Sequence, residues 1–359
     1  MKKHHQSKIN QGHRHLQIFV LVVFILLSLI FIQANRVIDQ ENISQTIPLG
    51  VSFSPRYAQD LGQDPQVVYR QILKDLDVKN LRLSASWDEI EPKPGKFNFD
   101  NLDYYLSQAE AAQAQVLLAV GFKLPRWPEC RSPYWLDYKN TQLRQERQLL
   151  MVKEVVKRYN QNPTVFAFQV ENEPLLSFDF GICPTADEKF LQQEVALIRS
   201  LTKKPLILTD SGELGWWTKP MQLSDYMGTT LYRIVHNNYL GLVPYYFQPW
   251  YYRLKFGLIS TLLAPQNKGT IVVELQGEPW ANTALTEVSL NQQLQSFPLS
   301  QFKTNVNFAK KVGAKQIYLW GAEWWYYIKS QGHPEYWEYA KGIFKGINFF
   351  AYLYLSTAF

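Results

Sequence analysis

Cysteine is scarce in this chain of 359 residues, with Cys130 and Cys183 as its two examples. Neither has the spacing of a thiolate metal site. Histidine is also rare, with six residues, and His236 and His333 have no second ligand at a recognisable spacing. We therefore expect no metal site.

A strong charge of one sign is lacking as well. The formal charge is +6, and part of it lies in the first fifteen residues, MKKHHQSKINQGHRH. Nucleic-acid binding needs Lys and Arg clustered on one face, so the sequence predicts no nucleic-acid partner. A glycine-rich phosphate turn is missing after the first apolar run, which weakens a dinucleotide-binding open sheet.

A long uncharged run, LQIFVLVVFILLSLIFI, follows the basic head. Its length is close to what a membrane-spanning helix needs. Four basic residues precede it and one follows closely; they are Lys2, Lys3, Lys8 and Arg14, then Arg36. This asymmetry predicts a cytoplasmic N-terminus and an extracytoplasmic remainder.

The sequence therefore predicts a basic cytoplasmic head (1–15), a transmembrane signal anchor (16–33), a linker (34–46) and one domain (47–359). The alternative is a cleavable signal with a cut near Ala34, which would make the protein secreted. The bulky Ile32 stands three residues before that cut, where a small residue is usual, so we favour the anchor.

Eight short apolar runs follow, beginning at residues 47, 80, 115, 165, 205, 226, 270 and 316. Helical patterns lie between them: Asp64 caps one helix, and Thr185 with Glu188 forms a capping box for another. Apolar strands that alternate with helices predict a parallel sheet covered on both faces. We expect an α/β fold, a single (β/α)8 TIM barrel preceded by the transmembrane helix.

Two segments allow further expectations. Residues 236–265 form either a loop followed by the sixth helix, which we favour, or an aromatic lid or a surface that touches membrane or substrate. The apolar tail 348–359 is too short to span a bilayer and is expected to pack on the barrel. Cys130 and Cys183 follow the third and fourth apolar runs, so an exported chain could join these neighbouring loops by a disulfide.

Carboxylates end two of the runs: Glu173 in VFAFQVENEP and Glu274 in IVVELQ. Active sites of such barrels collect at the C-terminal ends of the strands, where these two can meet. A retaining glycosidase needs one protonated carboxyl and one ionised carboxylate. Glu278 is the alternative to Glu274 as nucleophile. Glu171 is expected to be a buried partner of Arg82 or a polar layer residue rather than a catalytic group.

These motifs carry a resemblance to a known family. Asn172–Pro174 after the fourth run, with a Glu ending the seventh, resembles the clan A glycoside hydrolases, and the stretch LRLSASWDEIEPKPGKFNFDNLDYYL resembles the family 42 β-galactosidases. The resemblance implies Glu173 as acid and base and Glu274 as nucleophile. It also implies that Asn172 bonds the 2-hydroxyl of the sugar and that Trp320 is an aromatic platform under it. Around the nucleophile it implies Tyr232 as the hydrogen-bonding neighbour of Glu274 and Arg82 as a structural cation beneath that carboxylate. Trp280 is a further candidate sugar contact, with a core position as its alternative.

The sequence thus predicts a retaining glycoside hydrolase that cleaves β-glycosidic bonds of an oligo- or polysaccharide without a cofactor. Its partners would be the carbohydrate substrate and, through the anchor, the cell membrane. The alternatives are a noncatalytic carbohydrate-binding barrel and a transglycosidase at the cell surface. Sugar and linkage are not specified by these motifs.

Overall fold

The computed structural model describes residues 2–44, 46–176, 181, 183–185, 187–237, 239–281 and 283–346. The chain divides into two compact units, Met1–Thr46 and Ile47–Phe359. The first contains the helix α1 (Lys2–Ser44), and Gln17–Glu41 is long and apolar enough to cross a membrane. The tail 348–359 lies outside the described residues, so its expected packing stays a prediction.

The second unit is a closed barrel of eight parallel strands, in the order β1-β10-β9-β6-β5-β4-β3-β2. All eight apolar runs form its strands, as predicted. The strands are β1 (Leu49–Ser52), β2 (Asn80–Ser84), β3 (Gln115–Val120), β4 (Val165–Val170), β5 (Leu206–Asp210), β6 (Tyr226–Leu231), β9 (Thr270–Gln276) and β10 (Gln316–Trp320). The predicted (β/α)8 architecture is therefore confirmed.

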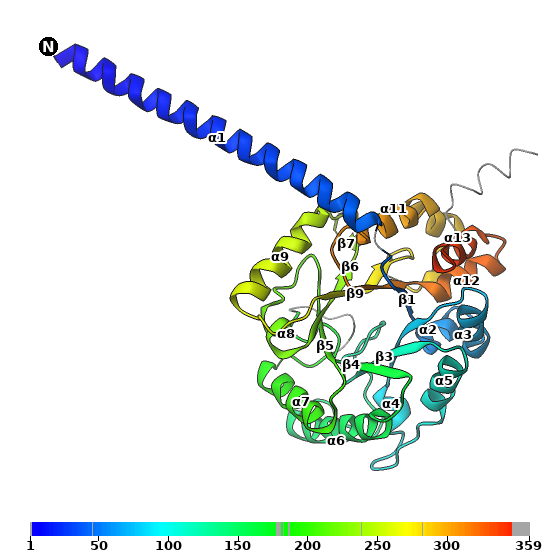
Figure 1. Ribbon diagram of the computed structural model, residues 1–359. Coiled ribbons are helices and arrows are strands. Elements are labelled where there is room, and N and C mark those ends of the chain that lie inside the picture. Colours follow the sequence, from blue (N-terminus) through cyan, green and yellow to red (C-terminus); the bar gives the residue numbers. More distant parts are fainter. Residues whose placement is uncertain are drawn as a thin grey trace, which may run out of the picture. The chain divides into compact units, whose positions relative to one another are not determined.

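Helices surround the barrel (Figure 1). They are α2 (Pro55–Asp60), α3 (Pro65–Lys74), α4 (Trp87–Ile90), α5 (Asp100–Ala111), α6 (Thr141–Tyr159), α7 (Glu188–Leu201), α8 (Thr218–Leu223), α9 (Pro249–Leu262), α10 (Leu290–Ser296), α11 (Leu299–Ala309), α12 (Ala322–Ser330) and α13 (Glu335–Phe344), with the 3-10 helix η1 (Leu285–Glu287). Asp64 caps α3 as expected, with its side chain accepting from Gln66 N and Val67 N.

One helix start differs from the prediction. The N-cap of α7 is Asp187, whose side chain accepts a hydrogen bond from Phe190 N, so the expected capping box of Thr185 and Glu188 is wrong. A carboxylate at the cap can bond the free N–H groups of the first turn as a threonine would. It also carries a negative charge that suits the positive end of the helix.

The segment 236–265 contains the sixth helix, α9, as favoured, but it begins with strand structure that the sequence analysis missed. The antiparallel hairpin of β7 (Ile234–Asn237) and β8 (Gly241–Pro244) precedes α9. Gly241 has a φ of +70°, a backbone conformation that glycine adopts without steric cost.

The core has two parts. The larger packs the strands against the helices. The smaller lies on the other side of the strands, inside the barrel, and consists of Leu117, Ala167, Ile207, Ile271, Val273 and Tyr318. Leu117 is level with Arg82 on one neighbouring strand and with Ala167 on the other, so Arg82 shares the interior face. An arginine inside the barrel needs buried acceptors, because an unpaired charge there would be costly.

Candidate active site

Glu173 and Glu274 both lie at the C-terminal edge of the barrel. Glu274 is near the end of β9, and Glu173 lies three residues beyond the last residue of β4. Both side chains are buried, each 5% exposed. Glu173 has a φ of +46°, which is uncommon for a residue with a Cβ and points to a backbone held by its surroundings. The barrel thus brings together the two carboxylates that the sequence singled out.

Two donors hold the Glu274 carboxylate. Arg82 Nη1 donates to Oε1 at 2.8 Å, and the Tyr232 hydroxyl donates to Oε2 at 2.9 Å. The ring of Trp280 packs edge-on against Tyr232, with 4.8 Å between the ring centroids. Charge-assisted hydrogen bonds to both oxygens fix the orientation of the carboxylate and stabilise its negative charge.

Arg82 ties three strands together beneath the carboxylates. Besides Glu274 it donates from Nε to Gln169 Oε1 and from Nη2 to Asn172 Oδ1, each at 2.8 Å. The side chain is 1% exposed, so its charge depends on these partners rather than on water. Arg82 therefore fixes the positions of Glu274 and Asn172 relative to each other.

Glu173 has a different environment. Its oxygen Oε1 accepts a hydrogen bond from Thr230 Oγ1 at 3.1 Å, and its backbone N–H donates to Thr209 Oγ1 at 2.7 Å. Burial first, and then the negative charges of Glu274 and Glu129, raise the pKa of Glu173 well above the usual glutamate value. A glutamate in such a place holds its proton more strongly than one in water.

Glu171 does not face this pair. Its carboxylate accepts from Phe122 N at 2.7 Å, from Lys123 N at 2.5 Å and from Gln148 Nε2 at 2.6 Å. Its suggested pairing with Arg82 is therefore not formed, whereas the expectation of a buried polar role holds. Glu171 fixes the backbone that leaves β3.

Glu278, the alternative nucleophile, has other partners than Glu274. It forms an ion pair with Arg126 and accepts a hydrogen bond from the Tyr57 hydroxyl at 3.1 Å. The Arg126 guanidinium lies over the rings of Tyr57 and Trp320, at 3.7 and 3.9 Å from their centroids. Arg126 thus occupies one face of Trp320, the ring that sequence reasoning assigned to a sugar.

Sequence reasoning missed both Arg126 and Glu129. Glu129 is buried, accepts from Asn172 Nδ2 at 2.9 Å and forms an ion pair with Lys123 at 3.5 Å. Both residues lie in the irregular loop after β3, where no periodic pattern marks inward-facing positions. Their only signal was their place directly after a barrel strand.

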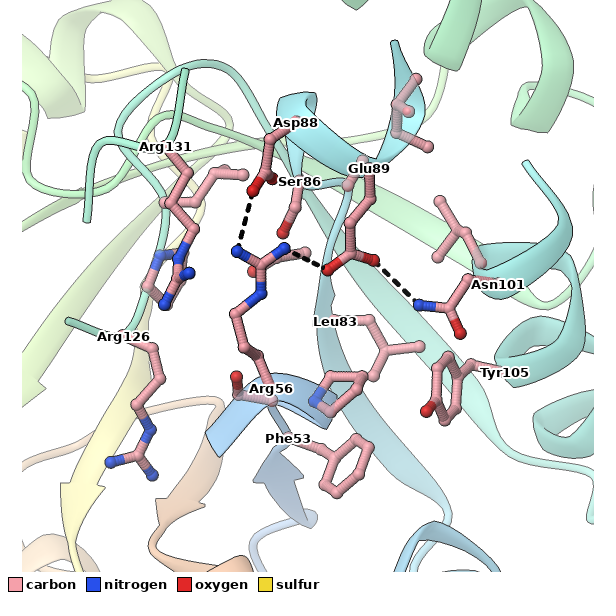
Figure 2. Close-up of a pocket in the computed structure, with 18 of the residues that line it drawn as sticks. Phe53, Arg56, Leu83, Ser86, Asp88, Glu89, Asn101, Tyr105, Arg126 and Arg131 are labelled. Atoms are coloured by element: carbon pink, nitrogen blue, oxygen red, sulfur yellow. Dashed lines mark hydrogen bonds and ion pairs between the residues drawn. The ribbon is translucent and has the colours of Figure 1, made fainter. Parts of the chain in front are cut away.

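The predicted disulfide is present between Cys130 and Cys183 and joins the loops after β3 and β4. A cavity of about 400 Å³ is lined from the segments that follow β1 and β2 and from the loop after β3 (Figure 2). Glu129, whose charge helps to raise the pKa of Glu173, belongs to this lining. Within the described part of the chain, no group of three or more His, Cys, Asp or Glu side chains could hold a metal ion.

Residues 68–142 match the model of glycoside hydrolase family 42, described as beta-galactosidase. The chain resembles family 42. This stretch contains β2, α4, α5 and β3, and so the loop from which the cavity is partly built. No curated protein sequence matches the chain.

Solved structures of similar fold include the beta-galactosidase from Rahnella sp. R3, with 14% identity over 77% of this chain and 51% of that chain and a TM-score of 0.51. The beta-galactosidase from Bacillus circulans sp. alkalophilus has 9% identity over 76% of this chain and 50% of that chain, with a TM-score of 0.50. The chain thus spans about half the length of these proteins. At such identities the likeness establishes the barrel fold.

Proposed function

We propose that the protein is a retaining glycoside hydrolase that cleaves β-glycosidic bonds of an oligo- or polysaccharide. The proton of Glu173 passes to the leaving oxygen as the glycosidic C–O bond breaks, while an oxygen of Glu274 bonds to the anomeric carbon. Water then attacks that carbon, Glu173 takes a proton from the water, and the bond to Glu274 breaks. No cofactor takes part in either step.

The contrast between the two carboxylates carries the proposal. Glu173 is buried with a raised pKa and suits a proton donor, whereas Glu274 is held by Arg82 and Tyr232 and suits a charged nucleophile. Glu278 is the weaker nucleophile candidate because Glu274, and not Glu278, is the carboxylate whose charge acts most strongly on the pKa of Glu173. The match of residues 68–142 to family 42 supports the same reaction class.

The neighbouring residues have supporting roles in this proposal. Asn172 uses one N–H for Glu129, which leaves a second N–H for the 2-hydroxyl of the sugar. Tyr232 and Arg82 keep Glu274 in place, and Trp280, which packs against Tyr232, would contact the reacting sugar. Trp320 would contact the sugar beside the guanidinium of Arg126 rather than across its whole face.

We further propose that the enzyme acts outside the cytoplasm on a single-pass anchor. The apolar helix Gln17–Glu41 and the basic residues before it support this topology. The Cys130–Cys183 disulfide also suits an oxidising compartment. A secreted protein, released by cleavage near Ala34, is the alternative. Its mature N-terminus, read by mass spectrometry, separates the two.

The test uses the full chain in detergent with aryl β-glycosides of galactose, glucose, mannose and xylose, and with those of galacturonic, glucuronic and mannuronic acid. We expect Glu274→Gln to abolish turnover. Glu173→Gln should lower the rate by about 10²–10⁴-fold for poor leaving groups and far less for dinitrophenol, which leaves without protonation. The exposed Glu287→Gln is the matched control and should keep full activity.

Three outcomes would change the proposal. Full activity of Glu274→Gln would move the nucleophile to Glu278. Oligosaccharide binding without turnover of any aryl glycoside would favour the noncatalytic barrel. Transfer of the glycosyl group to added sugar in preference to water would identify a transglycosidase.

A further inference from the structure

Charged side chains of both signs line the cavity described above. Figure 2 shows the arginines Arg56, Arg126 and Arg131 with the carboxylates Asp88 and Glu89, and Glu129 belongs to the same lining. It borders the proposed reaction centre, because Glu129 lines the cavity and accepts the hydrogen bond from Asn172. Its volume of about 400 Å³ is in the range of small-molecule sites.

Two of the arginines are already neutralised. Arg56 forms ion pairs with Asp88 at 2.8 Å and Glu89 at 2.7 Å. Arg126 pairs with Glu278, and its Nη2 lies 3.6 Å from Glu323 Oε2. These two cations therefore hold the walls of the cavity together.

Arg131 is different. Within the described residues no carboxylate forms an ion pair with it, and its Nη2 donates a hydrogen bond to the neutral carbonyl of Trp127 at 3.3 Å. Burial, and then the positive charge of Arg56, lower its pKa, and Asp88 is the first of the acids that offset this. A half-buried guanidinium in a cavity wall is thus left without an anion in contact.

The lining also contains neutral polar side chains, those of Ser86, Asn98 and Asn101. A hydroxyl and an amide each supply a hydrogen-bond donor and an acceptor. Sugar hydroxyls also donate and accept, so these side chains suit a carbohydrate ligand.

We propose that this cavity is a subsite for an acidic sugar, one that carries a carboxylate or a sulfate ester, and that Arg131 binds its charged group. As a statement about the substrate it rests on the proposed function. The charged group would form the ion pair that Arg131 lacks, and hydroxyls would reach the amides of Asn98 and Asn101. A planar guanidinium can bind such an oxyanion through two N–H groups at once.

The experiment measures binding rather than turnover. Full-length Glu173→Gln protein in detergent at low salt is titrated with the methyl β-glycosides of glucuronic and galacturonic acid, with those of glucose and galactose, and with the 6-sulfates of the neutral pair. Ligand-observed NMR gives each Kd. We expect the acidic ligands to bind about tenfold or more tightly than the neutral ones, as one charge-assisted contact allows.

Substitutions test the residue. Arg131→Gln should bring the ratio of acidic to neutral affinity close to one, and Arg131→Lys should keep part of the preference because it keeps the charge. Arg70→Gln on α3 removes the same charge outside the cavity, where Arg70 donates to Tyr104, and should change nothing. Preference for carboxylates over sulfates would identify a uronic acid, and the reverse a sulfated sugar.

Equal affinity for acidic and neutral ligands, or a preference that survives Arg131→Gln, would overturn the inference. These results are separate from the proposed function. Hydrolysis of neutral glycosides without a preference for acidic ligands would support the proposed glycosidase and contradict the acidic subsite. Preferred binding of acidic ligands without hydrolysis of any glycoside by the wild type would support the subsite and contradict the glycosidase.

Discussion

Replacing Arg82 by Gln should destabilise the barrel strongly. The side chain is 1% exposed, and its three nitrogens donate at 2.8 Å to Gln169, Glu274 and Asn172. Arg82 is one of the two donors described for the buried Glu274 carboxylate; without it, the hydrogen bond from the Tyr232 hydroxyl is the one that remains of this pair. Removing one partner of a buried ion pair costs about 3–5 kcal/mol, because the other charge is left uncompensated. Urea unfolding followed by circular dichroism measures this loss.

A surface pair is the control for that measurement. Arg158 pairs with Asp103, and the two side chains are 45% and 38% exposed. Arg158→Gln should cost about 1 kcal/mol or less, since exposed pairs are weak. Arg82→Lys should recover only part of the loss, because an ammonium cannot reach three separated acceptors from one plane. The reasoning is refuted if Arg82→Gln and Arg158→Gln lose equal stability.

Three further predictions concern Glu173, the disulfide and Gly121. Burial raises the pKa of Glu173, so ionising this group costs folding free energy at any pH above the unfolded glutamate pKa of about 4.3. Glu173→Gln removes that cost and should be more stable than wild type at pH 8. Urea titrations should show the difference vanishing below about pH 4. Replacing Cys130 and Cys183 by Ser should lower the unfolding free energy by about 2–4 kcal/mol, and an unchanged urea midpoint would contradict this. Gly121→Ala should lower the free energy of unfolding by about 1–3 kcal/mol. Gly121 has a φ of +135°, and an added Cβ would lie 2.4 Å from Glu171 Oε1. Equal melting temperatures of variant and wild type would contradict this.

The strands could be predicted because each is a buried run between helical patterns, and a closed parallel barrel fixes which ends meet. Glu173 and Glu274 were found in this way, since their places depend on strand ends alone. The resemblance implied Arg82 beneath Glu274 and Tyr232 beside it, and both side chains donate to that carboxylate. The other partner considered for Arg82, Glu171, is not bonded to it, because the loop after β3 supplies backbone N–H groups to Glu171.

The loop after β3 was beyond the reach of pattern reasoning. Arg126 has a φ of +88° and stacks on Tyr57 from α2 and on Trp320 from the end of β10. The position of Arg126 thus depends on contacts between a loop, a helix and a strand end that are far apart in the sequence, and such contacts leave no periodic signal in the loop itself. The hairpin β7–β8 was missed for a similar reason, since its strands are short and irregular in sequence.

The disulfide makes residues 130–183 a covalent ring. The ring consists of the main chain from Cys130 to Cys183 and the disulfide, and it contains α6, β4, Asn172 and Glu173. A single proteolytic cut inside the ring would therefore leave the two fragments joined until a reductant is added. If the loop after β3 were replaced by that of another barrel, the loop after β4 would have to be replaced with it, because each loop carries one cysteine of the disulfide.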